Sequence, residues 1–306
     1  MGQRFSDEAE ALARIRLVAF DLDGTLVRRD GTCSLFTRRV VRRARKSGVH
    51  VILATGRTLG APARLSRYLG LKEPLICSNG AHVVSGPPRA DWQFIPIPPD
   101  VLPGLVGIIR EAGVPFECHV KGKAKVERRF MGCLKSGRWS LRRAALGLLG
   151  ARLSTSAQVI EDWSSEKLAG QAVKLVVSAS KGVAREVASE CSSAFPGRVR
   201  CVTTVTTYGD ALLEIMDSSV NKGQALALVA ERLGVPMEEC AAVGDGDNDV
   251  EMLQSCGVGV AVANASPRLS LAADRFTLSC DQDGAARFLA EVIDARERSS
   301  PRGNRS

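Results

Sequence analysis

The sequence lacks the features that mark secreted, membrane-spanning and zinc-binding proteins. Its first 16 residues contain no apolar run, so they predict neither a signal peptide nor a membrane span. The nine cysteines are an odd number and include no Cys-x-x-Cys pair, which argues against a disulfide framework and a zinc site. We find no internal repeat, and aromatic residues make up only 5% of the chain. We therefore expect a cytoplasmic protein with reduced thiols and no membrane contact.

The net charge of +9 is concentrated in two stretches, so it is not a general property of the surface. Residues 38–46 carry +6, and residues 121–143 carry +8. In the first stretch Phe36, Val40, Val41 and Ala44 recur at helical spacing, which makes the arginines the outer face of an amphipathic helix. Few aromatic residues are interleaved with the basic ones, so we do not expect nucleic-acid binding. For residues 121–143 a solvated basic face is favoured over recruitment of an anionic substrate.

At 306 residues the chain is long enough for two domains. Short apolar strands at 17–20, 50–54, 74–77, 241–243 and 257–262 alternate with helical patterns, and polar residues follow each strand. This alternation predicts an α/β fold, a doubly wound Rossmann-like parallel sheet. Between these two groups lie helices, one of them at 134–149, among short strands that are typical of an inserted α+β cap domain. We assign residues 15–84 and 218–295 to the core, 85–217 to the cap, and 1–14 and 296–306 to disordered tails.

Two carboxylates, Asp21 and Asp23, come directly after the first strand and are followed by Gly24. In open α/β sheets the carboxyl edge of the strands is where ligands bind. Clustered carboxylates repel one another unless a cation lies between them, and oxygen-only ligands suit Mg²⁺. Alone, each such residue has a plainer interpretation, because Asp and Thr also cap turns and helices. Two carboxylates together at the ligand-binding edge of the sheet favour a functional site over a structural one.

The order of the motifs resembles the haloacid dehalogenase-like hydrolases, and in particular their Cof-type subfamily with a type IIB cap. The matching segments are Asp21-Leu22-Asp23-Gly24-Thr25, Ala54-Thr55-Gly56-Arg57, Ser78-Asn79-Gly80-Ala81, Asn221-Lys222-Gly223, Gly244-Asp245-Gly246-Asp247-Asn248-Asp249 and Ala261-Val262-Ala263-Asn264-Ala265. The cap is matched in size and position only.

This resemblance implies a set of roles for the matching residues. It implies that Asp21 is a nucleophile, that Asp23 is a general acid and base, and that Thr55 and Lys222 assist catalysis. Contacts to the substrate are implied for Leu22, Thr55, Gly56, Arg57, Asn79, Lys222 and Asn248. A Mg²⁺ site is implied for Asp21, the main-chain carbonyl of Asp23, Asp245 and Asp249. For Arg57 the alternatives are phosphate or a neighbouring carboxylate, and for Asn79 they are substrate or a turn.

The leading hypothesis is a Mg²⁺-dependent phosphatase that forms an aspartyl-phosphate and acts on a small phosphorylated metabolite, with sugar phosphates favoured. A phosphohexomutase similar to phosphomannomutases is the first alternative, because such enzymes resemble this core and cap. A nucleic-acid-binding protein that uses the basic surface is the second alternative. The sequence leaves the oligomeric state open.

Overall fold

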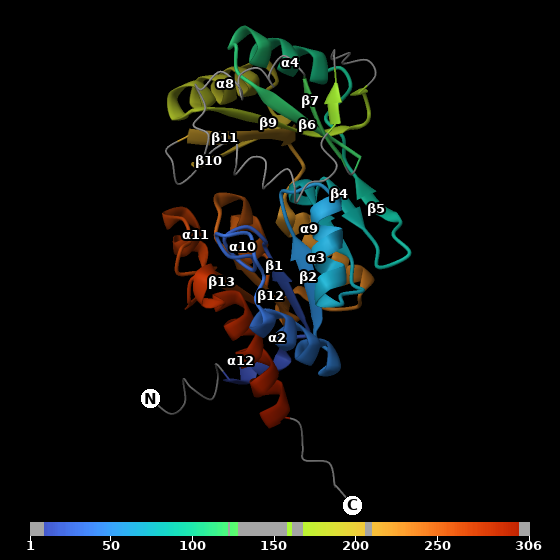
Figure 1. Cartoon of the computed structure of the whole chain (residues 1–306), viewed down its shortest axis with the longest axis vertical. Coiled ribbons are helices and arrows are strands. Elements are labelled where there is room, and N and C mark those ends of the chain that lie inside the picture. Colours follow the sequence, from blue (N-terminus) through green and yellow to red (C-terminus); the bar gives the residue numbers. More distant parts are fainter. Residues whose placement is uncertain (1–8, 122, 128–157, 161–167, 206–209, 300–306) are drawn as a thin grey trace, which may run out of the picture.

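The chain forms two sheets stacked one above the other (Figure 1). The computed structural model describes residues 9–121, 123–127, 158–160, 168–205 and 210–299. The eight-stranded sheet has the order β14-β13-β12-β1-β2-β3-β4-β5, and the six-stranded sheet has the order β10-β11-β9-β6-β7-β8. We call the six-stranded sheet and the helices on it the cap. The predicted α/β architecture with a parallel-sheet core is confirmed.

Six neighbouring strands of the eight-stranded sheet run parallel, and two further strands, each antiparallel to the strand before it, extend one edge. The parallel strands are β1 (Leu17–Phe20), β2 (His50–Ala54), β3 (Leu75–Cys77), β12 (Cys240–Gly244), β13 (Val258–Val262) and β14 (Arg275–Thr277), and the antiparallel ones are β4 (His82–Val84) and β5 (Asp91–Phe94). Leu17 of β1 pairs in register with His50 of β2 on one side and Cys240 of β12 on the other. The carboxyl ends of these three strands therefore meet at one edge, which faces the cap.

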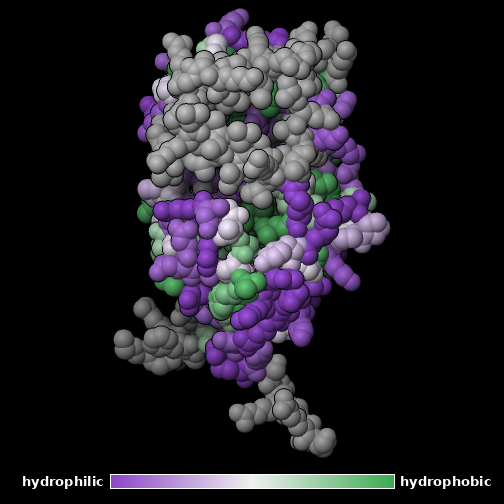
Figure 2. Space-filling model, viewed as in Figure 1, coloured by the Kyte–Doolittle hydropathy of each residue, from purple (hydrophilic) through white to green (hydrophobic). Residues whose placement is uncertain are grey.

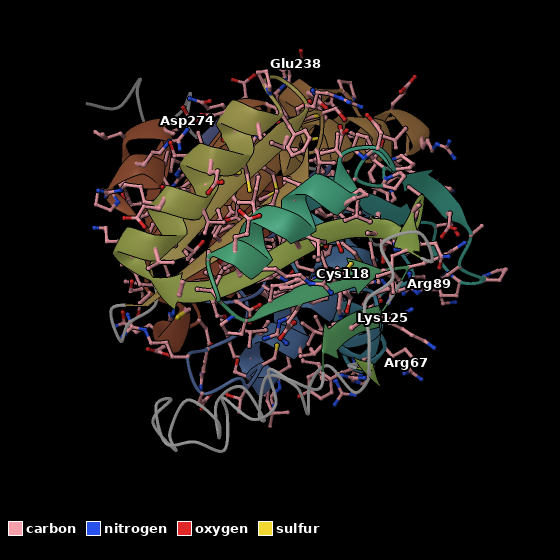
Figure 3. The ribbon with its side chains drawn as sticks, turned by 90° about the horizontal axis from the view of Figure 1, so that it is seen from above. Arg67, Arg89, Cys118, Lys125, Glu238 and Asp274 are labelled. Atoms are coloured by element: carbon pink, nitrogen blue, oxygen red, sulfur yellow. The ribbon has the colours of Figure 1, made fainter. Side chains whose placement is uncertain are left out.

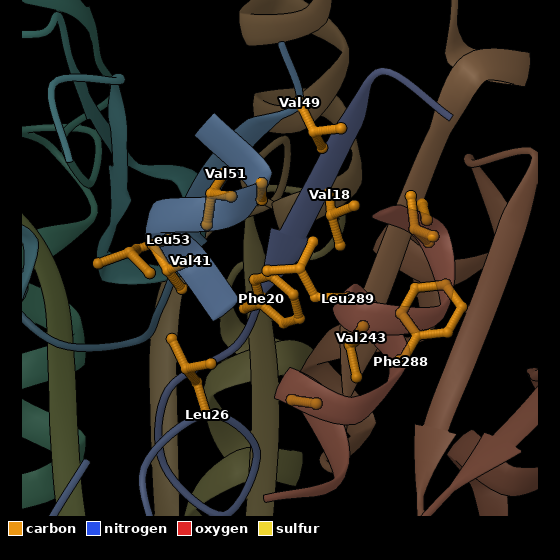
Figure 4. Packing of buried hydrophobic residues seen from close by; sticks show 14 of the residues in the cluster. Val18, Phe20, Leu26, Val41, Val49, Val51, Leu53, Val243, Phe288 and Leu289 are labelled. Atoms are coloured by element: carbon orange, nitrogen blue, oxygen red, sulfur yellow. The ribbon is translucent and has the colours of Figure 1, made fainter. Parts of the chain in front are cut away.

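Helices cover both faces of this sheet because side chains alternate along each strand. Val18 and Phe20 of β1 pack with α2 (Leu35–Lys46) and α12 (Gly284–Ser299), as Figure 4 shows for Val41 and Leu289. The alternate residues of β1 pack on the opposite face with α9 (Lys222–Arg232) and α10 (Val250–Gln254). Two further helices on this sheet are α3 (Gly60–Leu69) and α11 (Pro267–Ala272).

The amphipathic helix predicted around residues 38–46 is α2, with Val40, Val41 and Ala44 buried. Phe36 is an exception to the prediction, because it is 40% exposed and lies against Arg287, while Thr37 takes the buried position. The described surface on this side of the molecule is mainly hydrophilic (Figure 2).

The cap sheet carries its two described helices on the side away from the eight-stranded sheet (Figures 1 and 3). Its strands are β6 (Phe116–Val120), β7 (Lys123–Glu127), β8 (Gln158–Ile160), β9 (Ala172–Ser180), β10 (Val199–Val205) and β11 (Asp210–Asp217), and its helices are α4 (Leu102–Glu111) and α8 (Lys181–Ala194). Apolar residues of both helices form one cluster with β6, β9 and β11. The opposite face of the cap sheet is left to face the carboxyl edge of the parallel strands. The helix predicted at 134–149 lies outside the described residues.

Three segments differ from their sequence assignments. Strand β5 pairs with β4, so residues 91–94 extend the eight-stranded sheet, although their place in the sequence assigned them to the cap. Residues 9–14, assigned to a disordered tail, are helical, and Leu12 is buried in the hydrophobic core. Helix α12 continues to Ser299, into the segment 296–306 that was assigned to a disordered tail, and Arg296 donates to the Ile15 carbonyl at 2.8 Å. Among the described residues, no helix is both long enough and apolar enough to span a membrane.

Candidate active site

A cavity of about 450 Å³ lies between the carboxyl edge of the parallel strands and the cap. From the eight-stranded sheet it is lined by Asp21, Asp23, Thr55, Gly56, Arg57, Asp245 and Asn248, and from the cap by Glu117, His119, Lys174 and Glu214, among others. Residues from distant parts of the sequence therefore face one space, because parallel strands end at the same edge.

Three carboxylates gather beside this cavity, and two of them, Asp21 and Asp245, line it. Asp21 directly follows β1, Asp245 directly follows β12, and Asp249 follows four residues later at the start of α10. The neighbouring register of β1 and β12 brings them together, since Asp21 N donates to Val243 O at 2.9 Å. One oxygen from each of Asp21, Asp245 and Asp249 lies within 4.8 Å of the others.

Gly24 allows this close approach. It has φ +84°, in the left-handed region that L side chains rarely adopt, and a Cβ there would lie 2.2 Å from Asp245 Oδ2. The glycine after the paired carboxylates thus turns the chain and leaves room for the acid from β12. Thr25 then donates its hydroxyl to Asp245 Oδ1 at 3.1 Å.

Lys222 places a buried positive charge among these acids. It is the first residue of α9. The N-terminus of this helix is capped by Asn221, whose side-chain oxygen accepts from Gln224 N at 2.8 Å. Lys222 Nζ donates to Asp21 Oδ1 at 2.6 Å and to Asp249 Oδ1 at 2.5 Å. Burial disfavours the ammonium charge, but the two carboxylates outweigh this and raise the pKa of Lys222 above its ordinary value.

One lysine does not neutralise the whole acid group. Burial and the neighbouring carboxylates raise the pKa of Asp21 well above its ordinary value, although Lys222 opposes them. Burial and Asp249 raise the pKa of Asp245 to about 7, against Thr25 and Lys222. The donor set contains oxygen only and has excess negative charge, and both features fit a hard divalent cation such as Mg²⁺.

Asp23 lies at the same cavity but outside the acid group. Its side chain is 50% exposed and forms a two-point ion pair with Arg57, in which Nε donates to Oδ2 at 2.6 Å. Of the two partners considered for Arg57, the structure therefore shows the neighbouring carboxylate. Leu22, between the two aspartates, is buried, and its carbonyl accepts from Thr25 N and Val27 N.

The loops after β2 and β3 meet beside the acid group. Thr55 is buried, and its hydroxyl accepts from Arg57 N at 3.1 Å. Asn79 N donates to Thr55 O at 3.0 Å, which joins the two loops. Asn248, from the loop after β12, donates its side-chain amide to Asn79 Oδ1 at 3.1 Å.

The comparison with known proteins agrees with this geometry. The sequence profile of the haloacid dehalogenase-like hydrolases matches residues 18–289. The chain belongs to this family. The resemblance inferred from the motifs is thereby confirmed.

Relatives in the haloacid dehalogenase-like hydrolase family span nearly the whole chain. A 5-amino-6-(5-phospho-D-ribitylamino)uracil phosphatase of Bacillus subtilis is 29% identical over 280 residues, covering 90% of this chain and 97% of its own. A phosphoglycolate phosphatase of Archaeoglobus fulgidus is 30% identical over 274 residues, covering 90% and 95%. The crystal structure of a haloacid dehalogenase-like hydrolase from Bacteroides thetaiotaomicron has the same fold, with a TM-score of 0.75 and 24% identity over 91% of this chain and 99% of that one.

Sequence reasoning missed the residues that the cap adds to this haloacid dehalogenase-like site. Lys174 and Glu214 line the cavity, and they lie in the otherwise apolar strands β9 and β11. A charged residue within an apolar strand was the available signal, since a buried charge needs a partner. Which partner it meets is decided only by how the cap lies on the core.

Proposed function

We propose that the protein is a Mg²⁺-dependent phosphatase that hydrolyses small phosphorylated metabolites through an aspartyl-phosphate on Asp21. The observation that supports it most strongly is the acid group itself. Asp21, Asp245 and Asp249 come together from distant parts of the chain, and Lys222 contacts two of them. A carboxylate held beside a buried cation can attack phosphorus, because the charge of the incoming phosphoryl group is then offset.

In the first half-reaction the Asp21 carboxylate forms a bond to phosphorus while the bond to the ester oxygen breaks. Asp23 gives its proton to that leaving oxygen, and an alcohol departs. In the second, water attacks phosphorus, Asp23 takes the water proton, and the bond to Asp21 breaks to release inorganic phosphate. Both residues return to their starting states. Since Asp23 is paired with Arg57 in this structure, we infer that the arriving phosphoryl group draws Arg57 away, and that Asp23 then takes up from solvent the proton that it gives.

The phosphoryl oxygens have donors from several loops. Thr55 supplies a hydroxyl, Leu22 and Gly56 supply main-chain amides, and Asn248 supplies a side-chain amide, while Lys222 provides positive charge. The Asn79 side chain is held by protein partners on both sides, so we assign it an indirect role through Asn248.

The residues that would hold Mg²⁺ are Asp21, Asp245, Asp249 and the main-chain carbonyl of Asp23. This all-oxygen set matches the preference of Mg²⁺, which keeps several waters. Bound there, the ion would supply positive charge that draws the nucleophile and the phosphoryl group together.

Small metabolites are favoured as substrates because the two relatives above are named for phosphatases of such compounds. Within this class we favour sugar phosphates.

The described cysteines are all free thiols, which supports a reducing compartment and hence the cytoplasm.

The basic surface supports nucleic-acid binding less well. On α2, Arg43 pairs with Asp294 and Glu297, and Arg45 lies near Glu73, so part of the charge is locally neutralised. Most of the stretch 121–143 lies outside the described residues. Steeply salt-dependent binding to oligonucleotides would revive this alternative.

The test is a panel of phosphate esters assayed for inorganic phosphate release with Mg²⁺, and with excess chelator as the control. We expect release that requires Mg²⁺ and no bisphosphorylated activator. A phosphohexomutase would instead isomerise a hexose phosphate and need such an activator. Turnover that persists in chelator would contradict the metal assignment.

A further inference from the structure

Two charged residues of the cap lie against the core. Lys174 lies in β9 and is 1% exposed, and Glu214 lies on the neighbouring strand β11. The two side chains form an ion pair. Burial alone would raise the pKa of Glu214, but Lys174 and Asn79 outweigh it and hold that pKa below its ordinary value. The Glu214 carboxyl is therefore ionised beside Lys174 in this structure.

The contacts of this ion pair extend to the core, because each of its two residues also contacts a loop there. Lys174 Nζ donates to the Gly56 carbonyl oxygen at 2.7 Å. Glu214 Oε2 accepts from Asn79 Nδ2 at 2.6 Å. Since Asn79 Oδ1 in turn accepts from Asn248, the two cap residues are connected to the loops after β2, β3 and β12.

The core loop that Glu214 contacts has a backbone that needs support. Ser78 and Asn79 have φ of +49° and +58°, a conformation that costs free energy in residues other than glycine. Asn79 N donates to Thr55 O, and its side chain is held by Glu214 and Asn248. Gly56 is equally confined, since a Cβ there would lie 3.0 Å from Asn79 Oδ1.

We propose that Lys174 and Glu214 are positioning residues that give the phosphate-binding loops their working shape when the cap closes. This inference rests on the proposed function, because it assigns the loops their phosphate contacts. With the cap open, Gly56 and Asn79 lose these two partners, and the Asn248 amide loses a fixed neighbour. Closure and assembly of the phosphate site are then one event, so water meets the aspartyl-phosphate only in a complete site.

A second ion pair between cap and core provides a matched control. Arg200 of β10 contacts Glu251 of α10, on a part of the core that is not among the phosphate-binding loops. If cap attachment alone mattered, loss of either pair would slow the enzyme alike. If positioning matters, only loss of the Lys174–Glu214 pair changes the chemistry.

The experiment compares Lys174→Met, Glu214→Met, the double variant and Arg200→Met with the wild-type enzyme. Each single change at the Lys174–Glu214 pair leaves one charge without its partner and will lower the melting temperature. The double variant carries no charge at residues 174 and 214, and it should regain most of the melting temperature that the single variants lose. We expect it nevertheless to keep a kcat about 10–100-fold below wild type, with KM changed much less, because misplaced groups slow the step they serve. Arg200→Met should retain wild-type kcat.

Amide hydrogen exchange at residues 55–58 and 78–81 supplies a readout that does not need turnover. Exchange there should quicken in the double variant and stay unchanged in Arg200→Met. Wild-type kcat in the double variant, unchanged exchange, or an equal kcat loss in Arg200→Met would each overturn the proposal. If the wild-type enzyme cleaves no phosphate ester, the proposed function fails, and the exchange result still decides whether the cap pair shapes the loops.

Discussion

Replacing Asp245 by Asn should stabilise the metal-free protein. The carboxylate of Asp245 is buried among like charges, and burial together with Asp249 raises its pKa from 3.8 to about 7. At 1.36 kcal/mol per pKa unit this corresponds to about 4 kcal/mol by which ionised Asp245 destabilises the folded state. The Asn variant keeps an oxygen that can accept from Thr25 and loses the charge, so about 4 kcal/mol is the upper limit of its gain.

The gain should depend on pH in a defined direction. In the unfolded chain Asp245 ionises above pH 3.8, whereas in the folded, metal-free protein it ionises only near pH 7. Between these values the unfolded state releases a proton that the folded state keeps, so the wild-type protein loses stability as the pH rises. The advantage of Asp245→Asn is therefore absent near pH 4 and complete above about pH 7.

The assay is urea unfolding in excess chelator at pH 5 and pH 8, repeated with Mg²⁺. Mg²⁺ at 100 times its dissociation constant should stabilise the wild-type protein by about 2.7 kcal/mol and the variant by less. The free energies of unfolding of the two proteins should therefore lie closer together with Mg²⁺ than in chelator. Asp247→Asn is the control, because Asp247 is outside the acid group and accepts from Ser266. A variant that is less stable than wild type in chelator at pH 8, or a gain equally large for Asp247→Asn, would refute this reasoning.

The other predictions concern single residues of the same site. Asp21→Asn should lower kcat by at least about 10⁴-fold while the far-UV circular dichroism stays unchanged, and near-normal turnover would mean a different nucleophile. Lys222→Met should lower the free energy of unfolding in chelator by about 3–5 kcal/mol, because two buried carboxylates lose their shared cation; no loss would show that the lysine is not needed for their burial. Gly24→Ala combines a strained φ with a contact to Asp245 and should abolish activity. Gly48→Ala, with φ +74° and open space around its Cβ position, should retain activity and lower the free energy of unfolding by only about 1 kcal/mol. Equal losses of activity in the two variants would contradict the role given to the contact with Asp245.

The sequence by itself determined the local chemistry and the fold class. Apolar strands that end in polar residues predict a parallel sheet with its ligand edge at Asp21, Thr55 and Asp245, since this depends on patterns within a few residues. Local patterns failed at the boundaries: Phe36 fits the inner spacing of α2 and yet faces Arg287, and residues 91–94 look like part of the insertion and yet extend the first sheet.

Only the tertiary structure decided which charges share a space. The pairing of Arg57 with Asp23, and of Lys174 with Glu214, joins residues far apart in the chain, and no period or spacing encodes such a pair. Burial then decides how strongly the two charges of each pair interact, because the same two charges attract weakly in water and strongly where water is excluded. Whether Lys174 meets the carbonyl of Gly56 depends on how the cap lies on the core, and that placement is a property of the whole molecule.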